Sequence, residues 1–179
     1  MRPRHVHAAA RQSVQDLVEE RLHLLEPAAG AIVTCAALLG YRIDAKVLAL
    51  CAGAGIEATL EALRRACDFD LVITEAEEPN RYRFRHALTQ AAIRDAVVAG
   101  TKRELHAGIA RVLERLPDAV DRVEQISYHW SAAGNGAPAS ASNRQAAEHA
   151  LCLGSARIAA EFSQSVPLDA VDMEVEAID

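Results

Sequence analysis

The middle of the chain changes from one hydrophobic period to another, and this change restricts the fold more than any other feature. Over residues 81–85 basic and aromatic residues alternate, which predicts a strand that buries Tyr82 and Phe84 on one face and presents arginines on the other. Over residues 87–98 apolar residues recur at helical spacing. His86 is therefore predicted to lie where a strand ends and a helix begins.

This predicted corner is a candidate anion site. The start of a helix presents unsatisfied backbone N–H groups and the positive end of the helix dipole, and here it follows Arg81, Arg83 and Arg85. His86 and Arg85 are the candidate phosphate ligands. From the residues alone two plainer interpretations stay open: a helix-start histidine satisfied by nearby backbone, and a solvated arginine face.

Composition indicates a mainly helical protein. Only 4% of the 179 residues are aromatic although 51% are hydrophobic, so alanine and leucine supply the core, which favours helices over a β-sandwich or barrel. The four cysteines show no CxxC spacing, no apolar run reaches the roughly 20 residues of a membrane span, and no signal-peptide core follows the basic N-terminus. We expect a cytoplasmic protein with free thiols, no membrane contact and no metal site.

Local signals predict the elements of the first half. Pro27 suits the first turn of a helix that Gly40 stops, Asp44 suits an N-cap, and Gly53 breaks the helix that follows. The expected elements are helices over 14–25 and 27–39, a short strand at 42–43, helices over 45–52 and 56–67, and strands over 71–75 and 81–85. Four apolar positions are expected to form one buried stripe on the 56–67 helix: Ile56, Leu60, Leu63 and Cys67. Two helices joined by a Gly-containing turn and followed by a two-stranded β-hairpin predict a winged-helix domain.

The second half predicts further helices. They are expected over 86–98, 101–116, 117–133 and 143–165, with a flexible loop over 134–142 and a short acidic tail. The last two helices would form one hairpin of the TPR-like type that stacks in solenoids. The predicted domains are a lead-in helix (1–26), the winged-helix domain (27–99), a helical repeat-like region (100–165) and the tail (166–179).

Several blocks of the sequence together resemble a known family. In chain order the blocks are Arg21–Pro27, Ala36–Gly40, Tyr82–Leu88, Ala92-Ile93, Leu105-His106 and Tyr128–Gly134. They resemble the region that follows the nucleotide-binding core in bacterial STAND-type ATPases, which include the large ATP-binding LuxR-type transcriptional regulators and the AAA-fused adenylate or guanylate cyclases. The resemblance covers roughly residues 17–160, and its most distinctive block is Phe84–Leu88.

The resemblance implies a role for His86. In this family the winged helix is an intramolecular regulatory module that packs on the ATPase core. In related switch ATPases the histidine of a Met-His-Asp motif, at the strand-to-helix corner, contacts the phosphate of bound ADP and holds the closed state. That role would fall on His86. The chain departs from the motif, with Arg85 before the histidine and Ala87 after it, so any function of the motif's acid is absent or supplied elsewhere.

The leading hypothesis is a non-catalytic regulatory module of a STAND-type signalling ATPase. It would couple the nucleotide state of a neighbouring ATPase core, in cis or in trans, to a helical sensor region. No Gly-x-x-x-x-Gly-Lys-Ser/Thr motif or catalytic constellation occurs, so we expect no enzyme and no cofactor in this chain alone, and ATP or ADP in the parent protein. An apolar face left open without the core would favour self-association.

The alternative hypothesis is a free-standing winged-helix transcription factor. Its DNA contacts would come from four arginines on the wing and the preceding helix: Arg64, Arg65, Arg81 and Arg83. The exposed start of that helix carries Glu57 and Glu61, however, and carboxylates there repel phosphates. In the leading hypothesis the parent binds DNA only through another domain.

Overall fold

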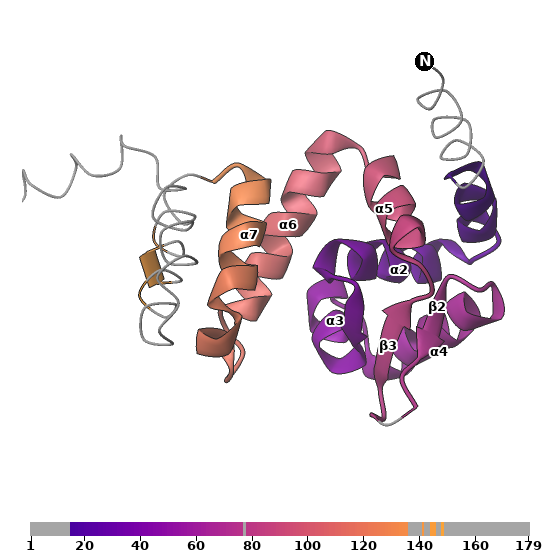
Figure 1. Cartoon of the computed structure of the whole chain (residues 1–179), viewed down its shortest axis with the longest axis horizontal. Helices are drawn as coiled ribbons and strands as arrows, with labels where there is room; N and C mark the ends of the chain where they lie inside the picture. The colour runs from indigo at the N-terminus through magenta and orange to yellow at the C-terminus, as the bar shows by residue number, and fades with distance from the viewer. Residues whose placement is uncertain (1–14, 77, 136–140, 142–143, 146–147, 149–179) are drawn as a thin grey trace, which may run out of the picture. The chain divides into compact units, whose positions relative to one another are not determined.

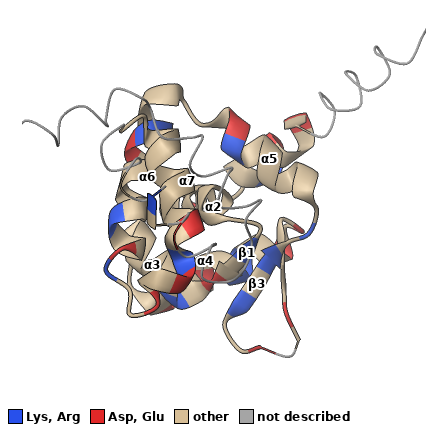
Figure 2. Ribbon diagram, turned by 60° about the vertical axis from the view of Figure 1, so that its left-hand side comes forward, with Lys and Arg blue, Asp and Glu red and all other residues tan. Residues whose placement is uncertain are grey.

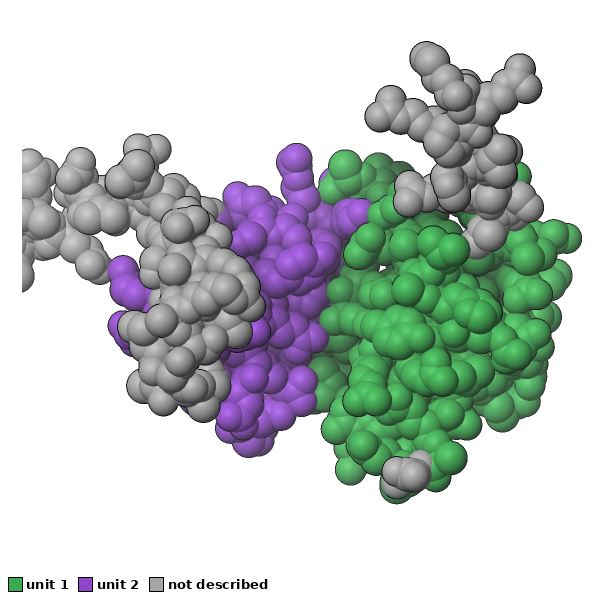
Figure 3. Space-filling model, viewed as in Figure 1, with its two compact units in different colours: residues 1–99 green, residues 100–179 purple. Residues whose placement is uncertain are grey.

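The computed structural model describes residues 15–76, 78–135, 141, 144–145 and 148 (Figure 1). The protein is mainly helical with a small three-stranded antiparallel sheet. Its contacts divide it into two compact units, residues 1–99 and 100–179 (Figure 3). The predicted acidic tail and most of the predicted 134–142 loop and 143–165 helix lie outside the described residues.

Unit 1 contains seven labelled elements after a helix over residues 15–23. They are α2 (Pro27–Leu39), β1 (Arg42–Asp44), α3 (Ala45–Ala52), α4 (Ile56–Asp68), β2 (Val72–Thr74), β3 (Arg81–Phe84) and α5 (Ala87–Ala96). Pro27 opens α2, the Gly40 N–H donates to the Ala36 carbonyl at its end, and Gly53 ends α3 with a φ of 62°, in the left-handed region. These local signals confirm the predicted helix bounds to within about two residues.

The sheet has the strand order β1-β3-β2, so β3 is its central strand and is antiparallel to both neighbours. The predicted hairpin of β2 and β3 is confirmed, with Val72 opposite Phe84. The expectation of a two-stranded sheet is wrong, because β1 also pairs with β3 and places Ile43 opposite Tyr82. Phe84 and Ile43 are fully buried, so the predicted burial of Phe84 is confirmed. Tyr82 is only half-buried, as are Arg81 and Arg83 on the same strand.

Of the four residues predicted to form the buried stripe of α4, only Leu63 is buried. Ile56 is 41% exposed, and Leu60 and Cys67 are only half-buried. The residues that α4 buries are Thr59, Ala62, Leu63 and Ala66. Helix α4 packs against α2 and α3, and small side chains on its inner face allow close approach. Helical spacing predicted that the large apolar residues of α4 are buried. Packing against α2 and α3 instead buries Leu63 together with the small residues Thr59, Ala62 and Ala66.

Asp44 caps α3, and its replacement tests how much the cap stabilises unit 1. Its Oδ1 accepts the backbone N–H of Lys46 at 2.8 Å and that of Val47 at 3.3 Å. Asp44→Ala is expected to lower the free energy of unfolding by about 1 kcal/mol, measured by urea denaturation with far-UV circular dichroism. Asp44→Asn is the matched control, because asparagine caps about as well and removes only the charge beside Arg81. Equal losses in the two variants would assign the effect to the ion pair instead of the cap.

Unit 2 contains α6 (Ala99–Leu113), a 3-10 turn η1 (Ala119–Arg122) and α7 (Val123–Ala133) among its described residues. The helix predicted to start at Pro117 begins instead with this 3-10 turn, and α6 ends before the predicted Leu116. Pro117 disfavours helical geometry at the residue before it and donates no backbone N–H, which separates the two helices. The buried side chains include Ile109 and Leu113 on α6 and Ile126 and Trp130 on α7.

Candidate functional site

His86 is the N-cap residue of α5 and its side chain is exposed. The backbone is extended there, with φ −137° and ψ 146°, and the His86 carbonyl accepts the N–H groups of Thr89 at 3.0 Å and Gln90 at 3.3 Å. The imidazole itself makes no capping hydrogen bond to α5. Its nitrogens therefore lie at the surface, at a strand-to-helix corner, where a ligand of unit 1 can reach them.

Arg85 is held beside this corner by an acid. Its Nη1 lies 2.9 Å from Oδ1 of Asp70, and the two side chains are 45% and 53% exposed. The backbone N–H of Arg85 also donates to the Leu71 carbonyl at 3.0 Å. An exposed pair of this kind contributes about 0–1 kcal/mol, so an incoming phosphate can compete with Asp70 for the guanidinium at small cost.

The other wing arginines also face carboxylates. Arg81 lies 3.4 Å from Asp44 on β1 and 3.3 Å from Glu78 in the hairpin turn. Asp44 is the residue opposite Arg81 in the β1–β3 register, so β1, for which the sequence predicted no partner strand, supplies an acid to the arginine face. Figure 2 shows the basic residues of β3 in blue.

Glu75, the residue after β2, forms ion pairs with two arginines. Its carboxylate lies 3.3 Å from Arg42 and 4.0 Å from Arg83, and its side chain is only 17% exposed. Nη1 of Arg83 also donates to the hydroxyl of Tyr41 at 3.3 Å. The predicted arginine face thus exists, but its positive charge is balanced by neighbouring acids and does not form an open basic patch.

The arginines of α4 form ion pairs with acids on the same helix. Arg64 lies 2.7 Å from Glu61 and 3.2 Å from Asp68, and Arg65 lies 3.2 Å from Glu61. Hydrogen bonds from Arg64 and then Arg65 lower the pKa of the Glu61 carboxyl to about 2. The bond to Glu61 likewise raises the pKa of Arg64. Glu61 therefore stays ionised and holds both cations on the helix that the DNA-binding alternative would use.

The described cysteines are free thiols, and two of them are poorly suited to nucleophilic chemistry. Burial, and then the nearby Cys51, raises the pKa of Cys35 to about 12. Burial, and then Asp68, also raises the pKa of Cys67. Because the thiolate is the reactive form of cysteine, these shifts favour inert thiols.

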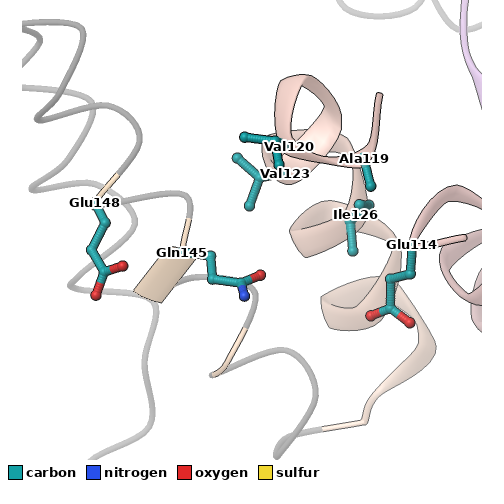
Figure 4. A pocket seen from close by; sticks show the side chains of 7 residues that line it. All are labelled: Glu114, Ala119, Val120, Val123, Ile126, Gln145 and Glu148. Atoms are coloured by element: carbon teal, nitrogen blue, oxygen red, sulfur yellow. The ribbon is translucent and has the colours of Figure 1, made fainter. Parts of the chain in front are cut away.

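Unit 2 contains a cavity of about 580 Å³ that the sequence did not indicate (Figure 4). Its apolar wall comes from η1 and α7, and its polar lining comes from Glu114, Gln145 and Glu148. Figure 4 shows Val120, Val123 and Ile126 on one side and Gln145 and Glu148 on the other. Glu114 is fixed because one carboxylate oxygen accepts the indole N–H of Trp130 at 2.6 Å. The volume lies within the range of small-molecule sites.

Sequence reasoning missed one buried polar cluster in unit 2. His106 on α6 and His129 on α7 are 2% and 0% exposed, and their Nδ1 atoms lie 2.8 Å apart. Both histidines occur in the sequence blocks that carry the family resemblance, but helical spacing alone cannot show that they meet. Trp130, next to His129 on α7, is 5% exposed, and the guanidinium of Arg111 lies 5.7 Å from its ring centroid.

Comparison of the chain with protein-family models, with curated proteins and with solved structures finds no match in any of the three. Within the described ranges, no group of three or more His, Cys, Asp and Glu side chains is arranged to hold a metal ion. The helices that the structure describes include none with the length and apolarity needed to cross a membrane.

Proposed function

We propose that this chain is a regulatory module of a STAND-type signalling ATPase, with a winged-helix domain in unit 1 and a helical sensor region in unit 2. The order helix, strand, two helices and hairpin, with the first strand paired to the last, supports a winged helix for residues 27–84. The nucleotide, ADP or ATP, would be held by a P-loop core that packs on unit 1.

The exposed imidazole of His86 carries this proposal. It belongs to the N-cap residue of α5, follows Arg85 in the sequence, and makes no capping bond that a phosphate would have to break. A neutral imidazole can donate one hydrogen bond to a phosphate oxygen, and a protonated one adds charge assistance. His86 would report the nucleotide state because an ADP phosphate on the core would be its ligand.

Unit 2 would bind or transmit the effector signal. Its cavity has an apolar wall and a polar lining, which is the usual character of a small-molecule site. Glu114 in this lining is hydrogen-bonded to Trp130 between α6 and α7. A ligand that displaced Glu114 would therefore act directly on the contact between the two helices.

His86→Ala tests the nucleotide contact in the protein that joins this chain to its P-loop core. ADP is expected to dissociate roughly ten times faster, because one hydrogen bond to a phosphate oxygen is lost. Release of a fluorescent ADP analogue in stopped flow measures the rate. His86→Asn should retain part of the effect because its amide still donates, and His23→Ala, at another exposed histidine, is the control. An unchanged ADP release rate in His86→Ala would remove His86 from the switch.

The DNA-binding alternative has weaker support. Each arginine that it would use is paired with a carboxylate: Arg64 and Arg65 with Glu61, Arg81 with Asp44, and Arg83 with Glu75. Binding DNA through them would require the phosphates to displace these acids. A gel shift of the whole chain at low salt decides between the two, since tight and sequence-dependent binding would favour the transcription factor.

A further inference from the structure

The pair of buried imidazoles between α6 and α7 has no part in the proposed nucleotide contact. The 2.8 Å between the Nδ1 atoms of His106 and His129 is a hydrogen-bond distance. The ring of Tyr128 meets both imidazoles edge-on, with its centroid 5.8 Å from that of His106 and 5.2 Å from that of His129. Both imidazoles are buried, so water does not replace this bond when it breaks within the folded unit.

The distance restricts where protons can be. One ring must carry a proton on Nδ1 and the other must leave its Nδ1 bare, so in the neutral pair the two rings are opposite tautomers. One additional proton can bind the outer Nε2 of the donor ring and leave the hydrogen bond intact. A second proton must bind the bare Nδ1, and two N–H groups would then face each other at 2.8 Å. The doubly protonated pair is incompatible with the observed packing.

We propose that the His106–His129 pair makes the α6–α7 packing acid-sensitive: it joins the helices near neutral pH and releases them when the pair takes up protons. Burial disfavours each imidazolium, and the second charge is also repelled by the first. This device would let unit 2 respond to pH independently of any nucleotide.

The residues one helical turn from each imidazole, on its own helix, include no acid. Tyr128 touches both rings, and a phenol is neutral near pH 6. One turn before His106, α6 carries Lys102 and Arg103, whose positive charges oppose a further one. The neighbours one turn from His129 on α7 are uncharged: Gln125, Ile126, Ala132 and Ala133.

The direction of the pH effect follows from proton binding in the two states. In the unfolded chain both imidazoles take up protons near pH ~6.5. The folded pair binds fewer protons at the same pH, so its contribution is complete above about pH 7 and is lost as the pH falls through about 6.5. If both protons are taken up on unfolding, the unfolding constant of unit 2 rises by up to about 100-fold for each pH unit below that range.

Urea denaturation of the whole chain, followed by the fluorescence of its single tryptophan, tests the proposal. Trp130 follows His129 on α7 and is 5% exposed, so its emission reports on this helix pair. The midpoint should fall steeply from about pH 7 to about pH 5 in the wild type and much less in the double variant H106L/H129L. His23→Asn, at an exposed histidine of unit 1, is the matched control and should behave as wild type. Equal slopes in wild type and double variant would overturn the proposal.

A measurement on the wild type covers the case in which the double variant fails to fold. Nitrogen NMR of the imidazoles at neutral pH should show one of these rings protonated at Nδ1 and the other at Nε2. Acidification should change both signals together with the Trp130 emission. Two Nε2–H rings, or protonation of both rings near pH ~6.5 as in a free histidine with unchanged Trp130 emission, would contradict the proposal.

Discussion

Phe84→Ala is expected to lower the free energy of unfolding of unit 1 by about 3–5 kcal/mol, the usual cost of removing a fully buried aromatic side chain. Phe84 is 0% exposed on the central strand, opposite Val72 and one residue before the arginine that pairs with Asp70. Since domains of this size are stable by only about 5–15 kcal/mol, much of the population would unfold at 37 °C or in low urea. Urea denaturation with far-UV circular dichroism measures the loss.

Two further variants separate cavity formation from a general effect at this corner. Phe84→Leu should cost clearly less than Phe84→Ala, because it keeps most of the buried volume. Leu88→Ala, on the first turn of α5, should stay within about 0.5 kcal/mol of wild type, since Leu88 is 54% exposed. If Phe84→Ala were no more destabilising than Leu88→Ala, Phe84 could not be a core residue of the sheet. The strand that precedes His86 would then not be anchored in the core through Phe84.

Leu113→Ala is expected to cost unit 2 about 2–5 kcal/mol. Leu113 is 0% exposed at the end of α6, one residue before the Glu114 that accepts the Trp130 indole N–H. Removal of this fully buried side chain leaves a cavity in the packed interior of unit 2. The urea midpoint of Trp130 emission should therefore shift to lower urea.

The exposed side chain of Val120 provides the control for this variant. Val120 lies in η1 and is 69% exposed, so Val120→Ala should change the midpoint little. Val120 also lines the cavity of unit 2, and this variant therefore tests whether ligand binding can be altered without loss of stability. A Leu113→Ala midpoint equal to that of Val120→Ala would contradict the packing of α6 on α7.

The balanced charges of unit 1 bear on both hypotheses for its arginines. Arg85 is paired with Asp70 and the α4 arginines with Glu61, so neither group is a preformed site for nucleic acid. A single phosphate contact at His86 needs at most one of these pairs to open. A DNA backbone would need several to open at once, which makes the regulatory module the more economical hypothesis.

Several features of this protein follow from local stereochemistry and could be predicted from the sequence. Pro27, Asp44 and Gly53 mark helix ends because a fixed φ, a capping carboxylate and a left-handed residue act within a few positions. The alternation over residues 81–85 predicted the strand and the burial of Phe84, and His86 was expected at the helix start where it lies.

Other features depend on residues that are distant in the sequence, and only the tertiary structure decided them. Pairing of Ile43 with Tyr82 made β1 the third strand and placed Asp44 beside Arg81, and packing on α2 and α3 selected the buried face of α4. In the same way, His106 and His129 met because α6 packs against α7. Hydrophobic periodicity indicates that a helix has an apolar face or that a strand has a buried face. It does not indicate which neighbouring element covers that face. The partners of the arginines and imidazoles therefore followed only from the packing.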